Sequence, residues 1–309
     1  MLLICGLMPA GNTFAQDEEK NIQSEALMNQ RPSSKRSTPI SNRKKVLYRV
    51  VRKSVRKKKR AVSKPMRVKM EDALLGLTIW KLRPAKKNDP ANELPEGSGD
   101  DDREIRSTEY TLERIEADMP LKDGERIRLS VESLSHKGYL YVVDRELYSD
   151  GTYSLPKLIY PTLLTQNRNS LIGAGDLIFI PQGARNFRVK SKQAEKTQVA
   201  EVLTFIISPK PLFKTANLQM KAIDISLSQF EDWVDKWEPN DTTLLEEIDG
   251  AGKTITLVEQ SVGQESAKDL TEESNRLSPD DPTPQTIFRS KIKSGNPYLV
   301  NVSIKYNGN

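Results

Sequence analysis

The sequence has one cysteine, Cys5, and one histidine, His136, among its 309 residues. This scarcity excludes a disulfide scaffold, a zinc site built from cysteine and histidine, and a cysteine–histidine nucleophile pair. A serine–histidine–aspartate triad would need His136, which lies in "SLSHKGYL" between two strand-like runs. An exposed turn histidine is the simpler interpretation there. We therefore expect no catalytic residue, no metal ligand and no cofactor.

Long apolar runs are also missing. No stretch approaches the about 20 apolar residues that a membrane-spanning helix needs. Residues 1–15, "MLLICGLMPAGNTFA", are largely apolar and uncharged and end in Ala15 before the polar "QDEEK", which predicts a secretory signal peptide. No basic residue precedes the apolar run, as expected if this leader is truncated at its start. A lipoprotein signal is disfavoured because Ile4, rather than a small residue, precedes Cys5.

Acidic residues are absent from Asn42 to Lys69, a stretch that holds fourteen lysines and arginines. Without those fourteen charges the formal net charge of +6 becomes −8. The sequence therefore predicts an acidic body that carries a basic arm. Residues 16–41 are polar and contain prolines, and we expect the whole of residues 16–69 to be a disordered, basic linker.

The densest part of this arm is "RVVRKSVRKKKR", residues 49–60. We expect it to associate with anionic lipid headgroups, lipopolysaccharide phosphates or teichoic-type polymers, at about 1 kcal/mol per basic residue. A solvated linker without a target is an equally good interpretation. Nucleic-acid binding needs a chain that is not exported and more aromatic residues than Tyr48. The predicted anionic-surface residues are Arg49, Arg52, Lys53, Arg56, Lys57, Lys58, Lys59 and Arg60.

From residue 70 onward the sequence has the pattern of short strands separated by turns. In "ERIRLSVESL", Ile127, Leu129 and Val131 alternate with polar residues, which predicts a half-buried antiparallel strand. "SDGT" at residues 149–152 is a strong hairpin signal. We therefore predict that residues 70–309 form a mainly β domain, an antiparallel β-sandwich or open barrel, with a flexible excursion at about residues 240–284.

One segment, "SLSQFEDWVDKWEP", predicts an amphipathic helix docked on the sheet. Ser228 and Glu231 have capping-box spacing, and Pro239 ends the helix. The predicted apolar face comprises Phe230, Trp233, Val234 and Trp237. We expect these side chains to be buried; a carbohydrate-stacking platform is the alternative and would expose the rings.

Two other patterns bear on nucleotide binding and on hydrolysis, but neither is sufficient to predict that function. "DGAGKT", residues 249–254, resembles the end of a phosphate-binding loop, but Glu247 occupies the position of the first glycine and would repel phosphate. We expect a surface turn there. Paired carboxylates such as Asp144 and Glu146 fit a hydrolase only if a cleft holds two acids across from one another.

Five segments follow one another in a familiar order: "LGLTIWKLRPA", "GERIRLSVESLSHKGYLYVVDRE", "LIYPT", "NSLIGAGDLIFIPQG" and "VLTFIISPKPL". Over roughly residues 75–213 the chain resembles the bacterial domain of unknown function 4384 family. Its motifs are structural, so the resemblance implies an all-β, extracytoplasmic accessory domain of envelope or secreted proteins and no active-site residue.

We therefore expect a secreted or periplasmic, non-enzymatic protein whose β-domain binds an unknown protein or envelope polymer. Its most plausible partner contacts are Tyr139, Tyr141, Tyr148 and Tyr153. Two alternatives stay open: a carboxylate-dependent hydrolase of the cell envelope, and a nucleic-acid-binding protein if the chain is not exported.

Overall fold

The computed structural model of the chain describes residues 22–32, 46–52, 69–86, 89, 110–116, 118–162, 170–182, 185–189, 196–214, 221–265 and 276–307. Within these residues the strands form two sheets, and three helices pack around them. All pairings between the named strands are antiparallel. The prediction of a mainly β, antiparallel fold is confirmed.

Nine of the described strands form one sheet. Its spatial order is β1 (Ile22–Gln23), β2 (Leu47–Arg52), β13 (Thr242–Glu247), β14 (Thr286–Lys293), β3 (Met70–Pro84), β5 (Arg126–Ser133) and β10 (Phe187–Arg188). Two further strands complete it, β4 (Tyr110–Ile115) beside β3 and β9 (Leu177–Ile180) beside β5.

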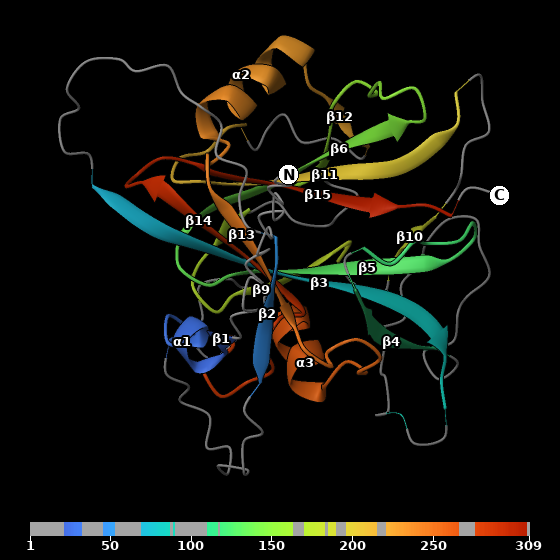
Figure 1. Ribbon diagram of the computed structural model, residues 1–309, viewed down its shortest axis with the longest axis vertical. Coiled ribbons are helices and arrows are strands. Elements are labelled where there is room, and N and C mark those ends of the chain that lie inside the picture. Colours follow the sequence, from blue (N-terminus) through green and yellow to red (C-terminus); the bar gives the residue numbers. More distant parts are fainter. Residues whose placement is uncertain are drawn as a thin grey trace, which may run out of the picture.

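The six-stranded sheet has the order β12 (Ile223–Asp224), β7 (Lys157–Tyr160), β6 (Gly138–Tyr148), β11 (Gln198–Ser208) and β15 (Tyr298–Lys305), with β8 (Leu171–Ile172) beside β6. Helix α2 (Leu227–Trp237) covers its outer face, while α1 (Glu25–Met28) and α3 (Leu257–Glu265) lie against the outer face of the nine-stranded sheet (Figure 1). The described residues therefore form a four-layer sandwich in which helices cover part of the outer face of each sheet.

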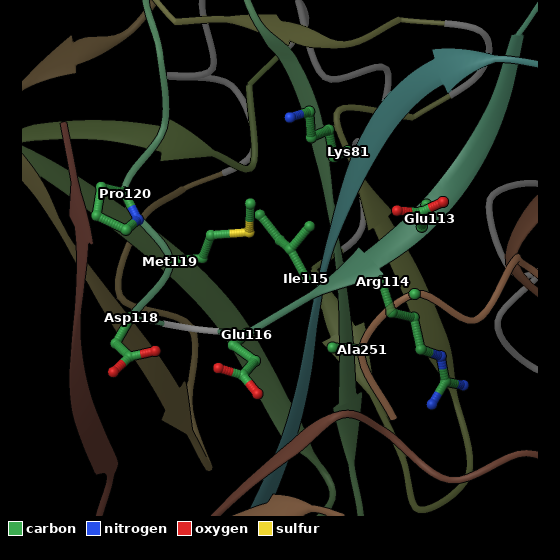
Figure 2. Close-up of a pocket in the computed structure, with 10 residues that line it drawn as sticks. Lys81, Glu113, Arg114, Ile115, Glu116, Asp118, Met119, Pro120 and Ala251 are labelled. Carbon is green, nitrogen blue, oxygen red and sulfur yellow. The ribbon is translucent and has the colours of Figure 1, made fainter. Parts of the chain in front are cut away.

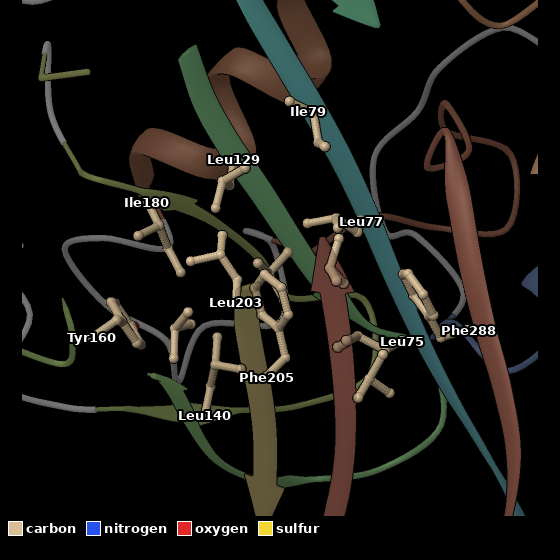
Figure 3. Close-up of a cluster of buried hydrophobic side chains, with 14 of the residues drawn as sticks. Leu75, Leu77, Ile79, Leu129, Leu140, Tyr160, Ile180, Leu203, Phe205 and Phe288 are labelled. Atoms are coloured by element: carbon tan, nitrogen blue, oxygen red, sulfur yellow. The ribbon is translucent and has the colours of Figure 1, made fainter. Parts of the chain in front are cut away.

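The main core lies between the two sheets. Leu75, Leu77 and Ile79 of β3 face Leu203 and Phe205 of β11 across it (Figure 3). The two-residue period of β3 directs Trp80 to the opposite face, where it joins a second cluster with α3. The alternation in residues 75–82 predicts one strand face with Leu75, Leu77 and Ile79 and another with Trp80, and the structure confirms both.

Strand β5 alternates as predicted, but it is not half-buried. Ile127, Leu129 and Val131 enter the core, and the outward-facing Arg128 and Glu132 are also buried, with 5% and 1% of their surface exposed. The outer face is covered because Arg31, which follows α1, and the segment around Ser278 pack over it. The polar side chains on this face therefore hydrogen-bond to other groups of the protein rather than to water.

Helix α2 occurs where its amphipathic pattern predicts it. Phe230 and Trp233 are buried against the six-stranded sheet, and Trp237 stacks on Trp233 at a centroid distance of 5.5 Å. This burial supports the docking interpretation. The N-cap is Ser226, not Ser228: its hydroxyl accepts a hydrogen bond from the Gln229 amide. The helix therefore begins at Leu227, two residues earlier than a cap at Ser228 would imply. Ser226 has the extended backbone conformation of an N-cap.

The expectation of disorder throughout residues 16–69 is wrong for 22–32 and 46–52. Strands β1 and β2 belong to the nine-stranded sheet, and Tyr48 is fully buried, with its hydroxyl donating to the Pro284 carbonyl at 2.5 Å. Arg31 donates all five guanidinium hydrogens, two to the oxygens of Glu132 and three to backbone carbonyls. The burial of Tyr48 and Arg31 with hydrogen-bond partners stabilises these two segments, although the surrounding sequence is polar and basic.

The expectation of a flexible excursion at about residues 240–284 is also wrong in part. Strand β13 pairs with both β14 and β2, and α3 packs on β9. Gly263 permits this packing, because a Cβ there would meet the Phe179 ring at 2.0 Å. The polar composition of the segment concealed these two elements.

Candidate binding surfaces

A pocket of about 470 Å³ opens where β4 ends, beside the turn between β13 and α3. Figure 2 shows Met119 and Ile115 directed into its middle, with the carboxylates of Glu116 and Asp118 along one side. Its lining comprises Lys81, Glu113, Arg114, Ile115, Glu116, Asp118, Met119, Pro120, Ala251 and Gly252. The pocket thus combines a small apolar floor with an acidic side.

Most charges around this pocket already have partners. The Lys81 ammonium lies 2.6 Å from Glu125, and Glu113 pairs with Arg83. Glu116 lies 3.4 Å from the guanidinium of Arg49. These ion pairs neutralise most of the charge on the pocket rim. The pocket therefore suits a small amphipathic ligand better than a highly charged ligand.

A buried ionic network lies beneath the pocket. Arg114 of β4 bonds to Glu247 of β13 at 2.8 Å and to Glu259 of α3 at 2.5 Å, and its guanidinium lies 5.3 Å from the centre of the Trp80 ring. Burial alone would lower the pKa of Arg114, but the two carboxylates hold that pKa above its ordinary value. Lys253, in the "DGAGKT" turn, completes the charge balance by pairing with Glu247 at 2.5 Å.

This network explains the turn that resembles a phosphate-binding loop. Glu259 receives hydrogen bonds from both the amide and the hydroxyl of Thr256, which caps α3. Glu247 and Lys253 bond to one another across the turn. Lys253 is therefore paired with a carboxylate of its own chain, whereas a nucleotide site would need this lysine to bind phosphate. The turn connects β13 to α3 and is stabilised by these bonds.

A second surface lies on the other side of the sandwich, between the β6–β7 connection and the start of α2. Tyr153, Leu155 and Leu227 have 45%, 63% and 39% of their surface exposed. The Pro156 carbonyl accepts from the Ile225 amide, which joins the two segments. We call these three exposed side chains the Tyr153 surface.

Arg145 of β6 supports this surface from below. Its guanidinium carbon lies 4.4 Å from the ring centre of Tyr153 and 5.2 Å from that of Phe230, and its Nε donates to the Ser154 carbonyl. Desolvation by burial lowers the pKa of Arg145. The cation–π contacts hold the tyrosine ring in place while leaving one side of it to solvent.

The predicted tyrosine contacts separate into two groups. Tyr141 is buried and its hydroxyl accepts from the Leu212 amide, so the expectation that it contacts a partner is wrong. Tyr139 is half-buried in the α2 cluster. Tyr148 donates to Glu146 at 2.8 Å and lies beneath Lys196. Tyr153 is the member of this group that the structure leaves substantially exposed.

The predicted anionic-surface residues are only partly described. Arg49 does not belong to a disordered arm: it lies in β2, and its guanidinium is 2.9 Å from Glu246. The backbone of Arg52 pairs with Leu244, at the end of the same strand. The remaining predictions lie outside the described residues, namely Lys53, Arg56, Lys57, Lys58, Lys59 and Arg60.

Sequence reasoning missed Leu155, Leu227 and Arg145. A signal was present, because Tyr153 and Leu155 are large apolar residues in a connection, "SDGTYSLP", that is otherwise polar. The pocket residues Glu116 and Met119 gave no comparable signal, because the pocket depends on the distant turn at Ala251. Only the folded chain brings these segments together.

Within the described ranges, no group of three or more His, Cys, Asp or Glu side chains could hold a metal ion. No helix in that part of the chain is long and apolar enough to cross a membrane. Comparisons with protein families, curated proteins and solved structures returned no match. The resemblance to the domain of unknown function 4384 family therefore stays a prediction.

Proposed function

We propose that the chain is an extracytoplasmic, non-enzymatic binding protein that engages a protein or envelope polymer through the Tyr153 surface. The observation that carries this proposal is the exposure of Tyr153, Leu155 and Leu227 together, around a cation, beside the helix that packs on the six-stranded sheet. Tyrosine and arginine are enriched in binding interfaces, and a rigidly held ring loses little entropy on binding.

The export part of the proposal is supported by the leader-like pattern of residues 1–15. Cleavage near Ala15 would leave the packed segment from Ile22 to Pro32 intact. The basic run that follows β2 would then face envelope polyanions, and each cation near such a surface contributes about 1 kcal/mol. This run would concentrate the protein where the Tyr153 surface meets its partner.

The chain offers a closely matched pair of variants for testing the Tyr153 surface. Leu155 and Leu257 have 63% and 64% of their surface exposed, but Leu257 begins α3 on the opposite side of the sandwich (Figure 1). We expect Leu155→Ser to reduce partner recovery at least about fivefold, because a central apolar contact contributes over about 1 kcal/mol. Leu257→Ser should leave recovery unchanged.

The measurement is quantitative cross-linking of tagged, full-length protein in the native envelope fraction, together with sedimentation on purified cell-wall polymer. The readout is the difference between the two variants, rather than capture itself. If no protein or polymer distinguishes Leu155→Ser from Leu257→Ser, the Tyr153 surface is not the binding site.

A carboxylate-dependent hydrolase of the envelope is the second candidate, and the pocket beside β4 is the observation that favours it. Glu113, Glu116 and Asp118 all line this pocket. Glu113 and Glu116 are each paired with an arginine, so neither side chain is free to approach a substrate without breaking that pair. Release of soluble fragments from purified cell wall by the intact protein would favour this function over binding.

A further inference from the structure

Strand β15 lies at one edge of the six-stranded sheet, where it pairs with β11 alone among the named strands (Figure 1). Other edge strands of the described chain are shorter or covered. Strands β1, β10 and β12 have two residues each, and β4 bonds on its free side to the turn around Lys253. Proteins ordinarily shorten or cover such edges, because unpaired backbone groups recruit other strands. The eight residues of β15 are therefore an unusually long edge in this fold.

The hydrogen-bonding pattern shows which backbone groups of this edge are open. The Tyr306 amide donates to the Val199 carbonyl of β11, so every second residue of β15, counted back from Tyr306, bonds to β11. The amides and carbonyls of Asn301 and Ser303 therefore point away from β11. Both residues are exposed, and no backbone group of the described chain bonds to them on that side. This stretch of β15 is thus an unpaired backbone edge.

The open stretch is bounded at both ends by the chain itself. At the start of β15, Leu299 is fully buried in the cluster that α2 forms with the sheet. At its end, the Leu121 amide donates to the Lys305 carbonyl and the Leu121 carbonyl accepts from the Asn307 amide, both at 2.9 Å. Leu121 thus already bonds to the edge as an added strand would. Residues 300–304 stay open between these ends, a length of about 16 Å for an extended chain.

On the inner side of this edge the nine-stranded sheet continues beyond the core. The Tyr298 hydroxyl donates to the Phe288 carbonyl, which places the start of β15 over β14. From β14 the sheet continues through β13 and β2, and the exposure of its side chains increases in that direction. Phe288 is 6% exposed, Leu244 opposite it is half-buried, and Val51, at the bulge of β2 beside Leu244, is 41% exposed. A strand added beside β15 would direct alternate side chains toward β13.

A second copy of the chain does not fit this edge. A twofold pair of β15 strands centred on Ser303 would set Val300 of one copy opposite Tyr306 of the other, because the two residues are equally far from the centre. Leu121 already occupies the place beside Tyr306. Centring the pair on residue 302 only moves Tyr298 into the same place. A single extended segment of about five residues avoids this collision.

We propose that residues 300–304 bind an extended segment of a partner polypeptide as an added antiparallel strand. Backbone hydrogen bonds supply the affinity, and alternate side chains supply the selectivity. The exposed face carries opposite charges at its two ends: Glu238 accepts from the Asn301 side chain at 3.1 Å, and Lys305 is exposed at the other end. A segment that begins with an acidic residue and ends with a basic one complements these charges. The Tyr153 surface does not include this edge, so the proposal is independent of the function proposed above.

The probe is a fluorescent peptide of about nine residues in which valine alternates with threonine, with glutamate first and lysine last. Its binding to the full-length protein is measured by fluorescence anisotropy. With the valines directed inward, the amides that bond to an antiparallel neighbour belong to the threonines. N-methylation of the threonine amides should therefore weaken binding at least about tenfold, and N-methylation of the valine amides should leave it unchanged. Equal effects of the two modifications would overturn the proposal.

Ser303→Pro removes one amide of the open edge and should weaken binding of the unmodified peptide at least about fivefold. Leu257→Pro is the control, because it places proline at the exposed first residue of α3, where a helix tolerates it. It should bind the peptide as the wild-type protein does. Absence of peptide binding to the wild-type protein, or undiminished binding to a folded Ser303→Pro protein, overturns the proposal.

Hydrogen exchange of the wild-type protein decides the case in which Ser303→Pro does not fold. The Ser303 amide should exchange rapidly in the free protein and at least about tenfold more slowly with the peptide bound. Slow exchange in the free protein would mean that the edge is already paired, with the chain's own segment in a monomer or with a second copy in a dimer. Either result overturns the proposal.

Discussion

Replacing Arg31 with methionine is expected to lower the free energy of unfolding by about 3–5 kcal/mol, because it leaves the buried Glu132 carboxylate without its cation. The side chains of Arg31 and Glu132 are 0% and 1% exposed, and both carboxylate oxygens bond to the guanidinium. Three backbone carbonyls of the Ser278–Pro282 segment lose their donor as well. Arg31 thereby joins the N-terminal segment, β5 and the segment before β14.

Urea unfolding followed by tryptophan fluorescence measures this effect. Arg289→Met is the control, since its pair with Asp72 is exposed and should contribute less than about 1 kcal/mol. The double variant Arg31→Met/Glu132→Met should recover much of the loss, because it removes the stranded charge. An Arg31→Met protein as stable as the control would show that residues 22–32 do not pack against β5.

Replacing Arg114 with methionine is expected to cost a similar amount, about 3–5 kcal/mol, and to make stability depend on pH. The change leaves Glu247 and Glu259 close together in a buried site without the cation between them. In the variant, burial and the mutual repulsion of the two carboxylates penalise their charged forms in the folded state. The folded variant therefore binds protons more readily than its unfolded chain does. Its loss of unfolding free energy relative to the wild-type protein should be smaller at pH 5 than at pH 8.

The measurement is a series of urea titrations across that pH range, with Lys236→Met as the control. Lys236 pairs with Asp232 on the exposed face of α2, so its loss should change neither the stability appreciably nor its pH dependence. If the loss of unfolding free energy in Arg114→Met is the same at pH 8 and at pH 5, the carboxylates of Glu247 and Glu259 have found other partners.

The strands that alternate were predictable from the sequence, because a two-residue period assigns each side chain to a face. Strand β3 shows this: Leu75 and Leu77 enter the core and Trp80 faces the other way. Helix α2 was predictable for the same reason, since Phe230 and Trp233 recur at a helical period. Only its N-cap was misplaced, because two serines lie two residues apart at its start.

The covering of the nine-stranded sheet was not predictable. A strand with charged residues on one face ordinarily turns that face to water, but Arg128 and Glu132 lie beneath other segments. Local patterns cannot reveal this, because the partner of Glu132 is Arg31, 101 residues away. The basic run likewise concealed β2, whose inclusion in the sheet depends on pairing with β13 almost 200 residues later.

The Tyr153 surface was partly predictable. Tyr153 was among the expected contacts and its side chain is exposed, while its contact with a partner stays a prediction. Tyr141 looked equivalent in sequence, but its strand lies under α2, so its ring fills the space between sheet and helix. Which tyrosines reach solvent depends on where α2 docks, and this is a property of the tertiary structure rather than of the strand pattern.

The central claim, a binding protein that works outside the cytoplasm, is tested most directly by fractionating cells that produce the full-length native protein and sequencing the N-terminus of the mature form. We predict an envelope or secreted protein whose first residue lies near Gln16. A cytoplasmic protein that retains Met1 would contradict the account, and the basic run after β2 would then be tested first against nucleic acids.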